Sequence, residues 1–114
     1  MKRILTTAAL AALLAASAAT AAPLKVGFIS TLSGGGAGLG IDARDGFLLA
    51  LKQAGDAGSE ITVITEDDQQ KPEIGVQLAD KMIQSDKVDI LTGIIFSNIA
   101  LAVALEEKRQ SGRR

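Results

Sequence analysis

The residues best suited to bind a small anion are Ser97 and Asn98, which stand where a predicted strand gives way to a predicted helix. Both residue types are common helix caps, and capping is the more general interpretation. A hydroxyl group and the free N–H groups of a helix start can also point together at a carboxylate. The two interpretations are compatible, because a capping residue also lines the anion site. The sequence therefore predicts a candidate carboxylate site at these two residues.

A glycine-rich segment, Ser33 to Gly40, follows a predicted strand and opens a predicted helix. Glycines in such a place let backbone N–H groups approach an anion, and a helix start favours negative charge. No position begins a G-x-G-x-x-G pattern, and no Gly-Lys-Ser/Thr is present, so the segment is not a P-loop. On spacing alone, an anion-binding loop and a plain turn are equally good interpretations.

Three acidic residues, Glu66, Asp67 and Asp68, end the second predicted strand. An acid at this position holds the ribose in dinucleotide-binding folds, but the glycine fingerprint of those folds is absent. Three carboxylates could also bind Ca²⁺. The interpretation we favour is a solvated loop in which Asp68 makes local turn hydrogen bonds.

The amino-acid composition excludes most of the side chains on which enzymes commonly depend for catalysis. The chain has no His and no Cys, which excludes a His-activated serine, disulfides, thiolate metal sites and a lipid-modified cysteine. A mechanism with paired carboxylates stays open, without positive support. We expect no cofactor. After residue 21 the chain carries 10 basic and 13 acidic residues, and this charge of −3 does not suggest a nucleic-acid partner.

The first 21 residues have the order of a cleavable signal peptide. Lys2 and Arg3 precede an apolar run, Ile4 to Ala16, and Ala19-Thr20-Ala21 fits the A-x-A cleavage pattern. The run of about 13 residues is shorter than the roughly 20 that a transmembrane helix needs. We therefore expect residues 1–21 to be a signal peptide, with cleavage after Ala21, and the mature protein to be periplasmic.

The rest of the sequence alternates short β-branched runs with helical periodicity. This order, βαβαβα, predicts an α/β fold of three layers with a parallel sheet, whose ligands lie beyond the carboxyl ends of the strands. The loops that matter most are then 31–40, 66–71 and 93–98. The predicted strands are Leu24–Ser30, Ile61–Thr65 and Val88–Thr92, and the predicted helices are Asp42–Ala54, Pro72–Ser85 and Asn98–Lys108.

With these residues in view, the sequence resembles the periplasmic solute-binding proteins of ABC transporters for branched-chain amino acids and related solutes. The resemblance covers residues 24 to 105. It is carried, in order, by the strand and Ser-Gly loop 24–34, the helix start 40–46, Asp67-Asp68-Gln69 with Lys71-Pro72-Glu73, the helix segment 76–83, and the strand 88–93 followed by Ser97.

The resemblance implies a two-lobed fold that closes on a small-molecule solute with a carboxylate, an amino acid or organic acid, and delivers it to an ABC permease. It implies that Ser97 binds the ligand carboxylate, with Asn98 and the loop containing Ser33 nearby. Leu39 matches a position that often holds an aromatic, so its identity departs from the family. Two alternatives stay open: an exported nucleotide- or phosphate-binding α/β enzyme, and a ligand-sensing receptor domain of the same fold.

Two features separate this chain from the family that it resembles. Family members are about three times longer, so residues 22–105 correspond to part of an N-terminal lobe. The segment Glu106–Arg114 is rich in charge and loses the family pattern, where an apolar approach to a fourth strand is expected. We therefore predict a fragment, a frameshifted reading frame or a degraded gene, with a divergent charged tail at 106–114.

Overall fold

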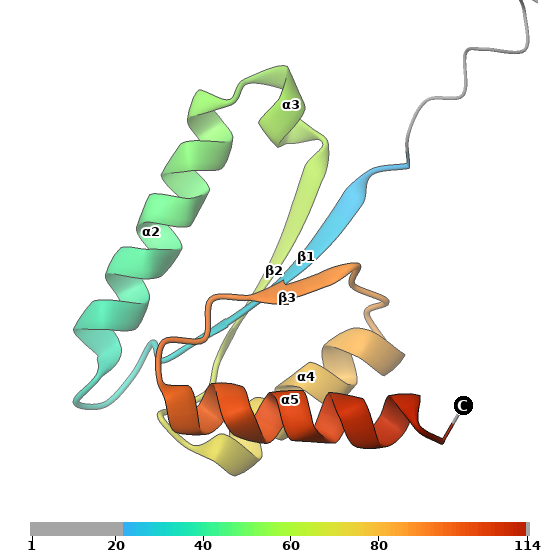
Figure 1. Ribbon diagram of the computed structural model, residues 1–114. Coiled ribbons are helices and arrows are strands. Elements are labelled where there is room, and N and C mark those ends of the chain that lie inside the picture. The colour runs from blue at the N-terminus through green and yellow to red at the C-terminus, as the bar shows by residue number, and fades with distance from the viewer. Residues whose placement is uncertain (1–21, 114) are drawn as a thin grey trace, which may run out of the picture.

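A computed structural model describes residues 22–113 of the chain, and the predicted signal peptide lies outside these residues. The described part has three layers (Figure 1). Helix α2, residues Ala37–Gln53, lies against one face of a sheet, and helices α4, Pro72–Gln84, and α5, Ser97–Ser111, cover the other face. The predicted α/β class, the three layers and the βαβαβα order are confirmed, with one extra short helix, α3, at Asp56–Ser59.

The sheet has three parallel strands in the order β2-β1-β3. Strand β1, Leu24–Ser30, is central, and β2, Ile61–Asp67, pairs with it along its whole length. Strand β3, Ile90–Thr92, pairs with the other side of β1 through three residues, starting at Val26↔Ile90. Because β1 has a neighbour on each side and helices on both faces, residues 26–30 are all buried.

Several predicted boundaries are wrong by a few residues. Strand β1 has the predicted bounds, β2 runs two residues further than predicted, and β3 begins at Ile90 rather than Val88. Helix α5 continues to Ser111, past the predicted end at Lys108. The largest error is at α2, which begins at Ala37 rather than Asp42, so that half of the predicted glycine-rich loop is helical.

Gly40 explains why a helix can begin among glycines. It is buried in the first turn of α2, against the backbone that leaves β1. A methyl group at Gly40 would lie 1.8 Å from the carbonyl oxygen of Thr31, which is far inside van der Waals contact. This glycine is therefore needed for the close approach of helix and strand, and not for loop flexibility.

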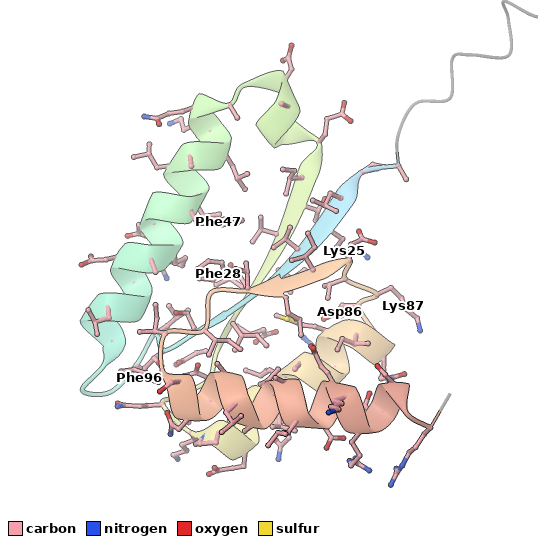
Figure 2. The ribbon with its side chains drawn as sticks, viewed as in Figure 1. Lys25, Phe28, Phe47, Asp86, Lys87 and Phe96 are labelled. Atoms are coloured by element: carbon pink, nitrogen blue, oxygen red, sulfur yellow. The ribbon has the colours of Figure 1, made fainter. Side chains whose placement is uncertain are left out.

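The hydrophobic core is divided between the two faces of the sheet. On the face of α4 and α5, Met82 and Ile99 are fully buried around Ile29 of β1. On the other face, Phe47 on α2 packs against Phe28 on β1, with 5.2 Å between the centroids of the two rings (Figure 2). The remaining buried apolar residues are Val26, Ala79 and Val103.

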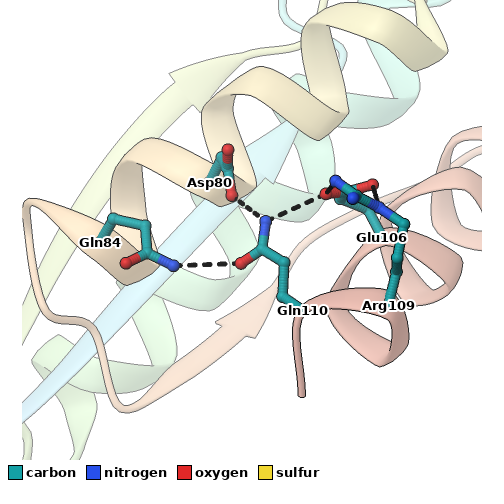
Figure 3. Close-up of polar contacts among 5 residues, drawn as sticks. All are labelled: Asp80, Gln84, Glu106, Arg109 and Gln110. Carbon is teal, nitrogen blue, oxygen red and sulfur yellow. Dashed lines mark hydrogen bonds and ion pairs between the residues drawn. The ribbon is translucent and has the colours of Figure 1, made fainter. Parts of the chain in front are cut away.

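The charged end of α5 is joined to α4 by a polar network (Figure 3). The side-chain amide of Gln110 donates to Asp80 and to Glu106, and its oxygen accepts from Gln84 at 3.0 Å. Arg109 bonds to Glu106, and the hydrogen bonds from Arg109 and Gln110 lower the pKa of Glu106 to about 2. The first residues of the predicted charged tail are therefore an ordered part of the packing of α5.

Several large apolar side chains are exposed among the described residues. They lie at the start of β1, on α2, on α5, and on β3 with the loop that follows it. In the described part of the chain no helix is long and apolar enough to cross a membrane. Within residues 22–113, β2 and β3 are the edge strands of the sheet, and each is paired on one side. The exposed large apolar residues are Leu24, Leu39, Leu48, Leu49, Ile90, Ile95, Leu101 and Leu105.

Candidate functional site

The loops after the three strands meet at the carboxyl end of the sheet. Figure 1 shows that α2, α4 and α5 all begin at this end. Gly36, at the start of α2, is the meeting point: a methyl group built there would lie 2.7 Å from the ring of Phe96 and 3.1 Å from the side-chain oxygen of Gln70. The three predicted loops therefore form one region, built from segments up to 60 residues apart.

Asp68 joins the first loop to the second. It is fully buried, and its Oδ1 atom accepts hydrogen bonds from the Thr31 hydroxyl at 2.6 Å and from the Gln70 N–H at 2.9 Å. Its other oxygen, Oδ2, has no protein partner among the described residues. The bond to Gln70 is the local turn bond that the sequence predicts, but the predicted solvation of this carboxylate is wrong.

Asp67 makes a second connection between the same loops. Its Oδ1 atom accepts from the N–H groups of Leu32 and Gln69, each at 2.8 Å. Partial burial raises the pKa of Asp67, but the hydrogen bonds from the Ser33 side chain and from the N–H groups of Leu32, Gln69 and Ser33 outweigh it, so the pKa lies below the ordinary 3.8. The carboxylate is therefore charged whenever the loops are assembled at neutral pH.

Acid should weaken the folded state through Asp67. Since the folded-state pKa is below the unfolded value of 3.8, this carboxylate stabilises the fold above pH 3.8, and the contribution is lost as the pH falls through the folded-state pKa. We expect Asp67→Asn, which keeps an acceptor oxygen but cannot titrate, to flatten this part of the stability profile. Denaturant midpoints measured between pH 5 and pH 2.5 give the stability profiles of the wild type and of Asp67→Asn. The difference between these two profiles is the contribution of Asp67, and parallel profiles would contradict the prediction.

Gln69 and Gln70 both adopt left-handed backbone conformations, with φ of 54° and 61°. Such angles are unfavourable for residues other than glycine. The two N–H groups donate to Asp67 and Asp68, so the acid pair holds the strained turn in place. This turn directs the Gln70 side chain toward Gly36.

Ser97 and Asn98 are exposed in the first turn of α5. The predicted role of Ser97 as cap is wrong: Phe96 is the N-cap residue, and no side chain makes a capping hydrogen bond there. Within the described residues, the first N–H groups of this helix with an acceptor are those of Ile99 and Ala100, both bonded to the Phe96 carbonyl. Among the described residues, the N–H groups of Ser97 and Asn98 and the Ser97 hydroxyl have no acceptor, so they can donate to a ligand.

The other two predicted site residues lie on the first loop and on α2. Ser33 is exposed and contributes to the charged state of Asp67. Leu39 is in the first turn of α2 with 60% of its surface exposed. The contact of Gly36 with Phe96 brings their segments next to the start of α5, but no hydrogen bond in the described structure joins Ser33 or Leu39 directly to Ser97 or Asn98.

The chemistry of this region favours an anion. Helices α2, α4 and α5 all begin in this region, so the positive ends of their dipoles lie there. The nearby carboxylates, Asp67 and Asp68, accept hydrogen bonds within the fold. Among residues 22–113, no group of three or more acidic side chains is placed to hold a metal ion.

The sequence predicts the local turn bond of Asp68 to Gln70, but it does not predict the contact of Gly36 with Phe96 or the bonds of the acid pair to Thr31 and Leu32. The acids stand at the end of a predicted strand, and this local signal supports the turn bond of Asp68 to Gln70. The contact of Gly36 with Phe96 has no local signal, because it joins loops that are distant in sequence.

Comparison with known proteins gives the family. The sequence matches the family described as periplasmic binding protein over residues 23–108. No match was found among curated protein sequences.

Three solved structures of substrate-binding proteins resemble the chain. An ABC transporter substrate-binding protein from Sphaerobacter thermophilus is 34% identical, with a TM-score of 0.67 over 75% of this chain and 24% of its own. A solute-binding protein from Rhodopseudomonas palustris BisB5, in complex with 3,4-dihydroxybenzoic acid, is 35% identical and has a TM-score of 0.70. The match covers 75% of this chain and 24% of that protein. An ABC-type branched-chain amino acid transporter protein from Rhodopseudomonas palustris CGA009 is 28% identical and has a TM-score of 0.69. The match covers 77% of this chain and 25% of that protein.

This chain thus spans about a quarter of the length of the solved structures that it matches. The matches confirm the predicted resemblance, since the proteins matched are substrate-binding proteins of ABC transporters, including one of the branched-chain amino acid type. The chain therefore belongs to the periplasmic binding protein family.

Proposed function

We propose that this chain is part of the exported solute-binding component of an ABC transporter, and that its solute is a branched-chain amino acid or a related small carboxylate. The single observation that carries the proposal is the meeting of three helix starts at the carboxyl end of the sheet, in a family of binding proteins. Export to the periplasm is part of the proposal and is supported by the pattern of residues 1–21.

Ser97 is the residue that we assign to the ligand carboxylate. Its hydroxyl group and the N–H groups at the start of α5 would donate to the two oxygens, and the positive end of the helix dipole adds to the attraction. Asn98, Ser33 and Leu39 border the same region and would contact the rest of the solute. The second lobe of a binding protein would close the site from the other side, so we expect the chain alone to bind weakly.

The solute class is open between two related chemistries. One matched protein was solved with 3,4-dihydroxybenzoic acid, and another is named for branched-chain amino acid transport. Both kinds of ligand carry the carboxylate that the α5 start suits. The half-buried Phe96 ring lies next to this helix start and offers an apolar surface to either an aromatic ring or a branched side chain.

Replacing Ser97 by alanine should remove the interaction with the carboxylate. We expect the wild-type chain to show millimolar, saturable shifts of the Ser97 and Asn98 amide signals in NMR titrations with leucine, isoleucine, valine, benzoate and 3,4-dihydroxybenzoate. A hydrogen bond to a charged group is worth roughly 1.5–3 kcal/mol, so S97A should weaken binding about tenfold or more.

Ser85→Ala is the matched control, because Ser85 is exposed at the far end of α4. It should leave the titration unchanged. Equal binding by S97A would overturn the assignment of Ser97. Saturable binding of ATP or NAD, with none of the carboxylates, would favour the nucleotide-binding alternative. Micromolar binding of any carboxylate by the chain alone would contradict the need for a second lobe.

A further inference from the structure

We propose that Gln70 and Phe96 make this site specific for an aromatic carboxylate whose ring carries a hydrogen-bonding group, such as a hydroxyl, opposite the carboxylate. The proposal deepens the proposed function and rests on it, because it takes the carboxylate to lie at Ser97. It favours an aromatic acid over a branched-chain amino acid. Its support is the way in which the three loops meet at Gly36.

The side-chain amide of Gln70 lies beside the tip of the Phe96 ring, and Gly36 leaves room for both. A methyl group built on Gly36 would lie 2.7 Å from Cζ and 2.8 Å from Cε2 of Phe96, and 3.1 Å from Oε1 of Gln70. Cζ and Cε2 belong to the end of the ring that is farthest from the backbone, and Figure 2 shows Phe96 at the turn that leads into α5. The Gln70 amide and the backbone of Ser97 therefore lie at opposite ends of the Phe96 side chain.

The turn that carries Gln70 is fixed by buried bonds. Its φ of 61° follows a φ of 54° at Gln69, and two such angles in succession cost free energy in residues other than glycine. The Gln70 N–H donates at 2.9 Å to Asp68, which is fully buried and also bonds to Thr31. Strained turns that are held in this way cluster at ligand sites. Because Gln70 itself is exposed, its amide can contact a solute without further ordering of the backbone.

A benzene ring with substituents at opposite ends matches this arrangement. With its carboxylate at Ser97, such a solute would lie along the half-buried Phe96 ring, and aromatic pairs stabilise one another beyond the area that they bury. A hydroxyl at the far end of the solute would meet the Gln70 amide, which can both donate and accept. A branched aliphatic side chain would place methyl groups against this amide, and a polar group left without a partner opposes binding.

The test compares two carboxylates of nearly equal size, 4-hydroxybenzoate and 4-methylbenzoate, in NMR titrations of the whole chain. We expect the wild type to bind 4-hydroxybenzoate about threefold to tenfold more tightly, which corresponds to one neutral hydrogen bond. Gln70→Ala should remove this preference and leave the binding of 4-methylbenzoate nearly unchanged. The ratio of the two affinities reports contact with the ligand, because a loss of folded protein weakens the binding of both ligands equally.

Three further variants separate the Gln70 side chain from the backbone that carries it. Gln69→Ala changes the same residue type in the same left-handed conformation, and it should keep the preference. Gly36→Ala should reduce the preference, because the added methyl group would displace the Phe96 ring and the Gln70 amide. Gly35→Ala is its matched control and should keep the preference, since nothing lies within 4 Å of a methyl group built there.

Each other outcome decides against the role of Gln70. Equal binding of the two benzoates by the wild type would overturn it and leave the carboxylate site at Ser97 standing, and so would tighter binding of leucine than of 4-hydroxybenzoate. A preference that survives Q70A, or that Q69A removes as well, would also overturn it. If the chain binds neither benzoates nor leucine, the proposed function fails together with the specificity that rests on it.

Discussion

Gly40→Ala is expected to lower the melting temperature of this chain by about 10–20 °C. The added methyl group would lie 1.8 Å from the Thr31 carbonyl oxygen, which belongs to the backbone and cannot rotate away. Helix α2 must then shift away from β1, with loss of the Phe28–Phe47 contact. Overpacking of this kind costs roughly 3 kcal/mol. Because the stability of such domains is only about 5–15 kcal/mol, this loss is a large fraction of the total, and thermal melts of G40A measure it.

Gly46→Ala is the matched control on the same helix. Gly46 is exposed, and nothing lies within 4 Å of a methyl group built there. Alanine in an exposed helix interior is more favourable than glycine by roughly 0.5–1 kcal/mol, so G46A should raise the melting temperature by a few degrees. A stable G40A, or a destabilised G46A, would show that the packing of α2 differs from the one described.

Removing the buried carboxylate of Asp68 should have the second large effect. Asp68→Ala leaves the buried Thr31 hydroxyl and the partly buried Gln70 N–H without their acceptor. Buried groups without partners cost about 1–3 kcal/mol each, so we expect a loss of roughly 3 kcal/mol, or about 10–20 °C in melting temperature. Calorimetry measures the loss.

Two variants sharpen this result. Asp68→Asn keeps the Oδ1 acceptor, so it should recover much of the stability that D68A loses. Asp45→Ala removes an exposed carboxylate whose partner is the neighbouring Arg44, and exposed ion pairs are worth little. We expect D45A to melt within about 2 °C of wild type. If D68A and D45A were equally mild, Asp68 would not hold the two loops together.

The fold was predictable because its signals are local. Strand β1 has the predicted bounds, and Pro72 opens α4 as predicted, since proline at a first helical position loses no hydrogen bond. The start of α2 was missed for a physical reason. Glycine serves both loop flexibility and close packing, and only the contact of Gly40 with Thr31 distinguishes the two.

The candidate site was predictable only in its location. The rule that ligands lie at the carboxyl ends of parallel strands predicted that the three loops would meet. The capping role of Ser97 was wrong, because the helix begins one residue earlier and Phe96 occupies the cap position. The bond between Asp68 and Thr31 spans 37 residues, and no periodicity in the sequence encodes such a pairing.

The central place of β1 has a consequence for the order of events in folding. The first strand of the sheet has neighbours from both later parts of the chain, and the bond from Lys25 to Asp89 spans 64 residues. A chain that emerges from its amino end presents β1 first, yet that strand gains its second neighbour only when residues 90–92 have followed. During this interval one side of the most apolar strand is open to the wrong partner. Non-local pairing of this kind forms slowly, so β1 stays exposed to incorrect pairing until β3 is in place.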